Sequence, residues 1–517
     1  MLVAAAVLTL AGVLASPAPI EQSIHSFAPT AAADVSMTPT TQPFLGDSVS
    51  APVGPGTPGI PLGSPASVGM SADRLEDITR IVEKGIAAGG FPGASVVVGH
   101  KGVSVLQRGY GRLDWAASSP AVNPDRTIYD LASLTKVVGT TTAIMILFDQ
   151  HRVALDAPVS RYLPEFSGGE KDEVTIRQLL IHRSGLPAGR EIWKITHDPA
   201  EARRIILETP LQSHPGQYYE YSDLGADVLG YVVEAVSGQS LDEFLQDYVF
   251  HPLGMYDTGF RPDPSLHDRI APTEVSPPRG YPLQGEVHDE NAFAMGGVAG
   301  HAGLFSTAAD LSVFAEMMLH GGEYNGVRII ADSTVDLFTT RAAGHRALGW
   351  DTPSGSYGSG HYLSPSAFGH TGFTGTSIWI DPDRDMFVVL LTNRVHEARA
   401  RNPAKVIGDV RSDLSDAASL AVNEGANDND VAIDAVFRAD SERGWNTSRR
   451  SLARGRGRHA KSLSSKHGHA ASSARGRSKR SGGSSAKGSS SKRSSKSSGK
   501  HSSTKHSSKH SSKRHGA

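Results

Sequence analysis

The chain has 517 residues, 38% of them hydrophobic and 20% charged, which is enough for a large domain or several small ones with a sizeable core. It contains no cysteine, which excludes disulfides, thiolate metal sites, a cysteine nucleophile and the lipid-anchored cysteine of a bacterial lipoprotein. The net charge of −2 is unevenly distributed. From residue 443 on there are 21 of the 51 Lys and Arg and no Asp or Glu, so the part before it holds 30 basic and 53 acidic residues. This asymmetry predicts a basic arm on an acidic globular body.

The N-terminal residues 1–15 are apolar but too few to span a bilayer comfortably, and small residues follow near Ala15 and Ser16. This pattern is typical of a signal peptide, the alternative being an uncleaved apolar segment. Residues 16–66 are rich in Pro, Ala, Thr, Ser and Gly and predict a flexible linker. We therefore expect an exported protein of bacterial type, in the periplasm, the cell envelope or the medium, with no transmembrane domain beyond the signal segment.

The predicted folded domain covers residues 67–415. Ser71 can cap a helix with an apolar face, and Gly-rich residues end that helix near Gly89. Residues 94–99 and 103–108 then predict two short strands joined by a turn.

The next motif is Ser133-x-x-Lys136, which begins an apolar run with helical periodicity. On a helix the two side chains are neighbours, and Ser133 lies in the first turn, where free N–H groups favour negative charge. A serine there, with an amine beside it, is placed to become a nucleophile. Lys136 would either take its proton, helped by desolvation, or keep a charge that stabilises a neighbouring phenolate. Taken alone, the motif is also compatible with a purely structural role.

The middle of the domain is predicted to be mostly helix and loop. Helices are expected at residues 174–182, 198–208, 222–237, 241–249 and 308–319, and an irregular Pro-rich loop at 260–290.

Tyr221-Ser222-Asp223 lies at the junction of a loop and a helix. A tyrosine at such a junction can point into a cleft and act as a general base if a cation lowers its pKa. The alternative makes Tyr221 a core aromatic residue and Asp223 the N-cap of the helix.

The late part of the domain predicts strands again, at residues 377–380 and 386–392, preceded by the tripeptide His370-Thr371-Gly372 on a strand. A glycine there lets the backbone approach a ligand. The N–H of Phe373 would then pair with that of Ser133 to hold an oxyanion. The alternative is an ordinary strand start with an exposed histidine.

Strands at both ends and helices between them predict an α/β (α+β) fold, with a central antiparallel sheet built from both ends of the domain and a mostly helical insertion. Three histidines, His182, His288 and His301, are far apart in sequence and lack metal-ligand spacing. We expect hydrogen-bonding roles for them, and we predict no metal and no cofactor.

After residue 415 the chain predicts an acidic linker, residues 416–442, and a disordered basic Ser/Lys/Arg/His tail, residues 443–517. The tail is either an electrostatic arm for an anionic polymer of the envelope or for nucleic acid, or a solvated extension without a specific partner.

Taken together, the Ser133, Tyr221 and His370 motifs resemble those of the serine β-lactamase and penicillin-binding protein superfamily, which uses Ser-x-x-Lys, a Tyr- or Ser-led second motif and Lys/His-Thr-Gly. The similarity is greatest to the class C-like branch, with its esterases and D-amino-acid peptidases. Residues 181–187 and 297–304 also resemble that branch.

The resemblance implies a β-lactamase/transpeptidase-like fold in which Ser133 is acylated and Lys136 and Tyr221 share the proton transfer. His370, Thr371 and Gly372 would form the third motif. Asp223 stands where class C β-lactamases have Asn, and His370 where they have Lys. Both departures argue against an efficient β-lactamase and favour an esterase or a D-amino-acid or DD-peptidase.

We therefore predict an exported serine hydrolase that cleaves an ester, peptide or cell-wall-type substrate through an acyl-Ser133 intermediate. One rival is a non-catalytic binding module that its basic tail docks on an anionic surface. Another is a nucleic-acid-binding protein whose tail carries the function.

Overall fold

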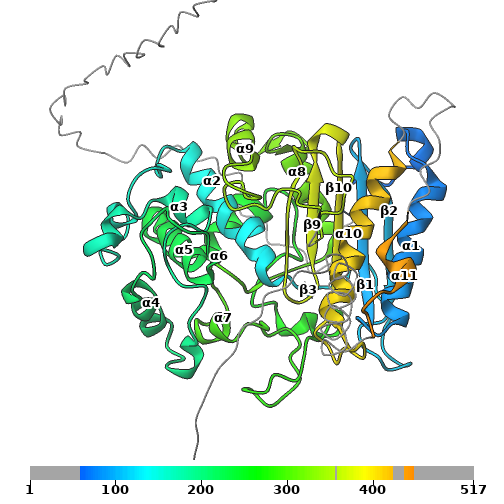
Figure 1. Cartoon of the computed structure of the whole chain (residues 1–517), viewed down its shortest axis with the longest axis horizontal. Helices are drawn as coiled ribbons and strands as arrows, with labels where there is room; N and C mark the ends of the chain where they lie inside the picture. Colours follow the sequence, from blue (N-terminus) through cyan, green and yellow to red (C-terminus); the bar gives the residue numbers. More distant parts are fainter. Residues whose placement is uncertain (1–58, 356–357, 423–435, 447–517) are drawn as a thin grey trace, which may run out of the picture. The chain divides into compact units, whose positions relative to one another are not determined.

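The structure, a computed structural model, describes residues 59–355, 358–422 and 436–446. Its largest sheet has the strand order β2-β1-β10-β9-β8, and each neighbouring pair is antiparallel (Figure 1). The pairing of β1 with β10 joins the two ends of the domain, with Ala94 opposite Thr392. The predicted fold class, an antiparallel sheet built from both ends with a helical insertion, is therefore confirmed. The five strands are β1 (Gly93–His100), β2 (Val103–Gly111), β8 (Phe368–Thr371), β9 (Ser377–Asp381) and β10 (Met386–Thr392).

Both faces of this sheet are buried, which explains why residues 386–392 form a continuous apolar run. Val388 packs in the core that α1 and α10 complete, whereas its neighbour Val389 packs in the core that contains α8. Successive side chains of a strand point to opposite faces, so a strand between two helical layers is apolar at every position. Figure 1 shows α1 and α10 together on one side of the sheet.

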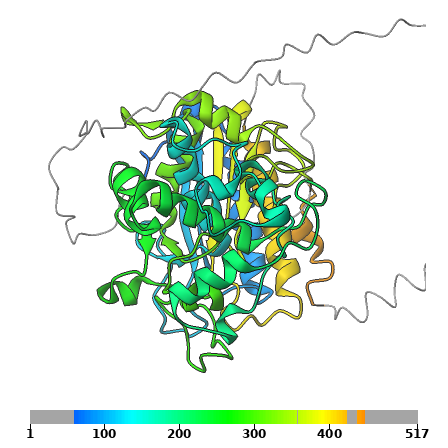
Figure 2. The same ribbon diagram turned by 90° about the vertical axis from the view of Figure 1, so that its left-hand side faces the viewer.

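The segment between β2 and β8 supplies most of the helices, and Figure 2 shows them in front of the sheet. The helices of the described residues are α1 (Ala72–Ala87), α2 (Thr142–Asp149), α3 (Ile176–Leu180), α4 (Pro199–Glu208), α5 (Asp223–Ser237), α6 (Leu241–Leu245), α7 (Glu290–Ala294), α8 (Ala308–Leu319), α9 (Asp332–Thr339), α10 (Pro403–Ala421) and α11 (Arg438–Ser441). Two small sheets contain the remaining strands of the described residues: β3 (Tyr129–Asp130) with β5 (Leu304–Ser306) and β4 (Gly259–Phe260), and β6 (Glu323–Tyr324) with β7 (Val327–Arg328).

Helix ends that carry strong capping signals fall where the sequence predicts them. In α4, the Asp198 side chain accepts a hydrogen bond from the N–H of Ala200, and a proline occupies the first turn. The helix predicted over residues 174–182 is shorter than expected. A capping box of Thr175 and Gln178 starts it, but His182 has a φ of 55°, in the left-handed region, where a right-handed helix cannot continue.

The packed unit extends beyond the predicted 67–415 at both ends. Ile60 and Trp445 are fully buried, and Arg438 of α11 forms ion pairs with Asp413 and Asp416 of α10. Part of the predicted acidic linker and the start of the predicted tail therefore belong to this unit, because a buried tryptophan lies beyond both boundaries. The predicted signal peptide, residues 16–58 of the first predicted linker, residues 423–435 of the second and residues 447–517 lie outside the described residues.

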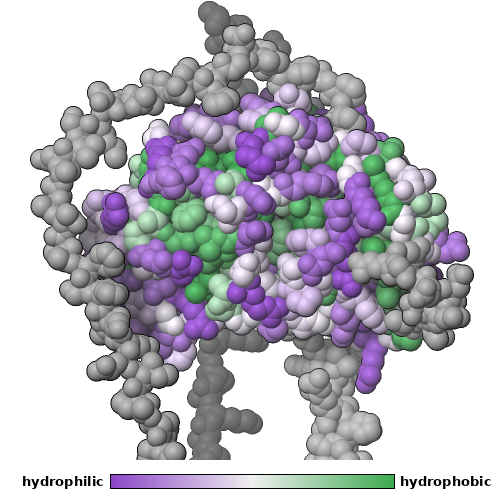
Figure 3. Space-filling model, turned by 90° about the horizontal axis from the view of Figure 1, so that it is seen from above, coloured by the Kyte–Doolittle hydropathy of each residue, from purple (hydrophilic) through white to green (hydrophobic). Residues whose placement is uncertain are grey.

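Within the described residues, one helical stretch is long and apolar enough to cross a membrane, namely residues 132–149. It is 83% buried inside the protein, as expected of a core helix, and was not predicted as a span. Figure 3 views the molecule from above and shows apolar side chains in a band bordered by polar ones.

Candidate active site

The chain around Ser133 changes helix type twice, and this corrects the single regular helix predicted there. A 3₁₀ turn, Ala132–Leu134, follows β3, then a π-helix, Thr135–Thr141, and only then α2. Ala132 has a φ of 48°, which costs free energy for a residue with a Cβ, and its N–H donates to Asp130 Oδ1 at 2.8 Å. π-Helical turns and strained residues of this kind concentrate at functional sites.

The Lys136 side chain is 4% exposed, and its ammonium group meets three oxygen atoms. Nζ donates to Ser133 Oγ at 3.0 Å and to the His301 carbonyl at 3.0 Å, and it forms an ion pair with Asp223 Oδ1 at 2.8 Å. An ammonium group has three donors, so these contacts can occupy all of them. The structure therefore brings Ser133, Lys136 and Asp223 together.

Burial and charge act in opposite directions on Lys136. Burial disfavours the ammonium form, but the interactions with Tyr221 and Asp223 outweigh it, so the pKa of Lys136 is raised. The sequence left two roles open for Lys136, proton acceptor or retained charge, and the Asp223 carboxylate beside the amine favours the retained charge.

Tyr221 lies between several cationic or aromatic groups at the start of α5. Lys136 Nζ is 5.0 Å from the centroid of its ring and Arg346 Cζ 5.3 Å, and the centroid of the His182 ring is 4.6 Å away. Ser222 rather than Asp223 is the N-cap of α5, since its hydroxyl accepts the N–H of Gly225. Asp223 is thereby free to pair with Lys136.

His370, on β8, is buried, and its ring centroid lies 6.1 Å from that of Tyr221. Burial, together with the charges of Arg346 and Lys136, lowers the pKa of His370 well below its usual value. Its Nδ1 donates to the Thr371 carbonyl at 2.9 Å, whereas Nε2 is buried without a hydrogen-bond partner among the described residues. This neutral imidazole agrees with the expected loss of a fixed positive charge and rules out an exposed histidine at a strand start.

Gly372 directly follows β8, where a side chain would not fit. An added Cβ would lie 2.1 Å from Thr376 Oγ1 and 2.4 Å from the Leu131 carbonyl oxygen. The close approach predicted for this glycine is therefore made to the protein's own backbone. Phe373, next in the chain, is 61% exposed, and no hydrogen-bond partner for its N–H is found within the described residues.

Arg346 is a residue of this site that the sequence analysis missed. Its Nε donates to the Tyr219 hydroxyl at 3.2 Å, and its Nη1 lies 3.0 Å from Asp351 Oδ1. It lies in a loop without periodicity or a recognisable motif, so no local pattern signals its place beside Tyr221.

The three singled-out histidines make the hydrogen bonds predicted for them. His182 Nδ1 accepts the N–H of Ser222 at 3.1 Å, and His288 Nε2 lies 2.8 Å from Glu274. His301 lies between Asp227, at 2.7 Å, and Asp289, at 3.0 Å. Burial opposes its charge, but the two carboxylates raise the pKa of His301 well above its usual value. In the part of the chain that the structure describes, no group of His, Asp and Glu is arranged to hold a metal ion.

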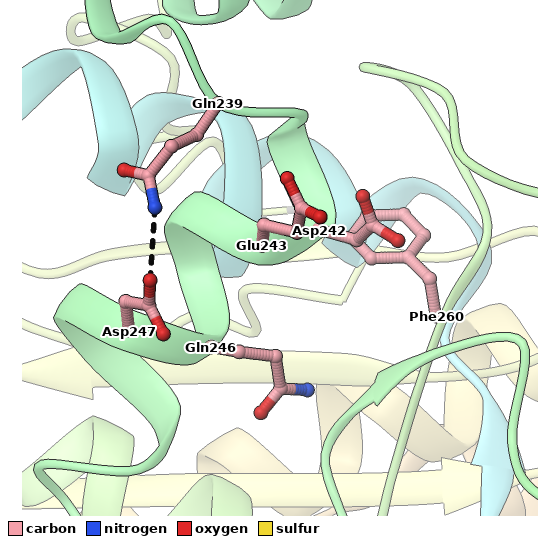
Figure 4. A pocket seen from close by; sticks show the side chains of 6 residues that line it. All are labelled: Gln239, Asp242, Glu243, Gln246, Asp247 and Phe260. Carbon is pink, nitrogen blue, oxygen red and sulfur yellow. Dashed lines mark hydrogen bonds between the residues drawn. The ribbon is translucent and has the colours of Figure 1, made fainter. Parts of the chain in front are cut away.

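A separate surface hollow of about 530 Å³ lies at α6 and the π-helix Gln246–Phe250 (Figure 4). It shares no residue with the groups around Ser133, and a hydrogen bond from Gln239 Nε2 to Asp247 Oδ2 spans part of its wall. The lining residues are Gln239, Asp242, Glu243, Gln246, Asp247 and Phe260.

Comparison with known proteins identifies the family of this chain. The family model described as Beta-lactamase matches residues 78–410. A protein of Escherichia coli (strain K12), named a candidate D-alanyl-D-alanine carboxypeptidase, is 32% identical over 382 residues, which cover 66% of this chain and 87% of that protein. An N-acetylmuramyl-L-alanine amidase of Bacillus subtilis (strain 168) is 34% identical over 364 residues, which cover 63% of this chain and 82% of that protein.

Among solved structures, a penicillin-binding protein homologue from Caulobacter crescentus matches with a TM-score of 0.56 and 24% identity. The match covers 68% of this chain and 99% of that one, and at this identity it supports the fold alone. The family model spans more than half of the chain, and the two relatives named above are each more than 30% identical to this chain. The chain therefore belongs to the Beta-lactamase family of hydrolases.

Proposed function

We propose that the protein is a serine hydrolase that forms an acyl-enzyme on Ser133. Ser133 Oγ attacks the substrate carbonyl carbon, and Tyr221, acting as a phenolate that the Lys136 cation stabilises, accepts the Ser133 proton. The N–H groups of Ser133 and Phe373 receive the oxyanion. The proton then passes to the leaving group as its bond to the carbonyl carbon breaks, and water releases the acyl group by the reverse proton route.

The observation that carries this proposal is the contact of 3.0 Å between Lys136 Nζ and Ser133 Oγ, with the same ammonium paired to Asp223. A buried lysine beside a serine is costly unless its charge is compensated. A non-catalytic binding module has no need of that arrangement, which is why we favour the enzyme.

For the substrate, we propose a peptide or cell-wall-type amide that contains alanine, with esters as further substrates. The two relatives support this class, since both of their names specify an amide bond to alanine. The neutral His370 and the engagement of Asp223 by Lys136 favour poor turnover of β-lactams, because neither residue supplies a free donor or cation for the β-lactam carboxylate.

The test is intact mass after incubation with a fluorophosphonate probe and, separately, with a penicillin. We expect a single probe adduct on the wild type, its absence from Ser133→Ala and its retention in Ser167→Ala, a change at an exposed serine. A lasting penicillin adduct would indicate a penicillin-binding protein, and its absence beside a probe adduct a peptidase or esterase. Folded protein without either adduct would overturn the enzyme and support the binding module.

We further propose export through residues 1–15 and electrostatic binding of an anionic envelope polymer by residues 443–517. The support is compositional: apolar and small residues at one end, and 21 basic and no acidic residues at the other. Binding of wall polyanion should fall steeply as salt rises from about 50 to 200 mM. A variant that ends at residue 446 should lose this binding and keep its hydrolase activity. Salt-independent binding would contradict the proposal.

A further inference from the structure

The turn that carries Phe373, residues 372–376 between β8 and β9, is fixed to the segment that leads to Ser133. The Thr374 hydroxyl donates to the Asp130 carbonyl at 2.7 Å, and the Thr376 hydroxyl donates to the Leu131 carbonyl at 2.9 Å. These bonds hold the Phe373 backbone in register with the start of the Ser133 turn, although more than 230 residues separate the two in sequence.

Arg411, on α10, contacts the same turn through its guanidinium group. Its Nη2 donates to the Gly372 carbonyl at 2.5 Å and to the Thr376 carbonyl at 2.8 Å. Its Nε is buried without a partner, and no carboxylate lies within ion-pair distance of it among the described residues. Burial and the nearby Arg394 lower the pKa of Arg411 to about 9, so the group is still cationic at pH 7.

The Gly372 carbonyl and the Phe373 N–H belong to one peptide unit. In a trans peptide these two groups point in opposite directions, so a donor on the carbonyl side sets the direction of the N–H on the other side. A hydrogen bond to the carbonyl also polarises the N–H, because hydrogen bonds along a chain strengthen one another. A cation at the carbonyl end therefore both orients this N–H and makes it a stronger donor.

We propose that Arg411 is a positioning residue for acyl transfer: it holds the Gly372–Phe373 peptide so that the Phe373 N–H faces the oxyanion. This inference rests on the proposed function, since it requires an oxyanion to form at Ser133. Arg411 acts through the peptide and does not contact the substrate. A buried charge without a counterion is costly, and its role in orienting this peptide accounts for its presence.

The effect of Arg411 on acylation can be separated from its effect on stability, because the Gly372 and Thr376 carbonyls each accept a second hydrogen bond. The Gly375 N–H donates to the Gly372 carbonyl at 3.1 Å, and the Gly372 N–H donates to the Thr376 carbonyl at 2.8 Å. Replacing Arg411 thus leaves neither carbonyl without a hydrogen bond. The fold should tolerate the change, while the peptide loses its cation.

The first experiment measures acylation by a fluorophosphonate probe over a range of concentrations, which separates the maximal rate from the half-saturating concentration. Loss of a whole oxyanion donor costs about 10²–10³ in rate, so a misdirected donor in Arg411→Met should cost about 10–100-fold, with half-saturation changed by less than about twofold. Arg411→Lys can still donate to one carbonyl, so its maximal acylation rate should lie between those of the wild type and Arg411→Met. Lys405→Met, on the same helix and paired only with Asp409, is the matched control.

The outcomes are distinguishable. If the wild type forms no adduct, the proposed function fails and takes this inference with it. If the wild type reacts and Arg411→Met reacts as fast as Lys405→Met, only the inference on Arg411 is overturned. A change confined to half-saturation overturns it as well, because it would indicate a role in ground-state binding.

A second measurement detects the Gly372–Phe373 peptide itself by NMR. The sequence contains three Gly–Phe pairs, at residues 90–91, 259–260 and 372–373. Labelling glycine with ¹³C at the carbonyl and phenylalanine with ¹⁵N isolates these three peptides in an NMR spectrum, and Phe373→Tyr identifies the third. Arg411→Met should move its carbonyl carbon and amide proton upfield and leave the other two peaks in place. Three unchanged peaks would show that Arg411 does not act on this peptide and would overturn the inference.

Discussion

Lys136 and His370 flank the same tyrosine ring, and both are buried, but they differ in charge. Lys136 has a carboxylate at 2.8 Å, and its pKa is raised. Among the described residues, His370 has no carboxylate partner, and burial together with two nearby cations lowers its pKa. Burial disfavours charge at both positions, so the counterion decides which residue is cationic.

His301 shows the same rule on the other side of the lysine. It is as buried as His370, but it lies between Asp227 and Asp289, which hold it in the imidazolium form. Its carbonyl oxygen also accepts a hydrogen bond from Lys136. Within the described residues, carboxylates neighbour His301 but not His370, and this difference gives the two histidines of one site opposite charge states.

The largest expected effect follows from removal of the paired cation. In Lys136→Met, the acylation rate should fall by about 10²–10⁴, the usual contribution of a positioned proton-transfer group. Stopped-flow measurement with a chromogenic ester checks this, with Lys405→Met as the control for loss of a charge elsewhere. A variant that keeps more than a tenth of the wild-type rate would contradict the role proposed for Lys136.

A smaller effect is expected when the counterion alone is removed. Asp223→Asn removes the carboxylate that offsets the effect of burial on Lys136, so the pKa of Lys136 should fall. Because the proposed mechanism requires the ammonium form, activity is lost as pH rises through that pKa. The high-pH limb of the rate profile should therefore move to lower pH, by about one pH unit for each 1.4 kcal/mol of lost interaction. A high-pH limb that stays in place would show that Asp223 does not control Lys136.

The smallest effect is on stability and has opposite signs at the two histidines. A raised pKa stabilises the folded state fully below the unfolded value of about 6.5, and this contribution is lost as pH rises through the folded pKa. His301→Gln should therefore be most destabilising in acid. The lowered pKa of His370 penalises the folded state as pH falls below about 6.5, so His370→Gln should become less destabilising there. Urea unfolding of both variants between about pH 5 and pH 9 checks this, and parallel slopes would contradict it.

Much of the fold could be predicted because its signals are local. The apolar run at residues 386–392 and the capped helices at 199–208 and 308–319 follow from periodicity and from caps within a few residues of each end. The stretch at 132–141 could not be predicted in the same way. Its apolar spacing fits a regular helix. Within it, however, the Ala132 N–H donates to Asp130 and Lys136 Nζ donates to the His301 carbonyl, both outside the segment, and these bonds accompany a 3₁₀ turn and a π-helix.

The candidate site likewise has residues that local sequence patterns predict and residues that they do not. The motifs at Ser133, Tyr221 and His370 could be recognised because each is short and their order is typical of the family. Arg346 and Arg411 could not, since each is a single arginine without a motif and reaches the site from another segment. The roles assigned to all these residues stay predictions until the acylation experiments are done.

By itself, the sequence determined the sheet with strands from both ends, the helix caps and the three motifs, because these depend on residue types within a few positions of one another. Only the tertiary structure decided the charges. Whether a buried lysine or histidine is ionised depends on the carboxylates and cations within a few ångströms of it. Here those groups come from distant segments, namely Asp223 for Lys136, and Asp227 and Asp289 for His301.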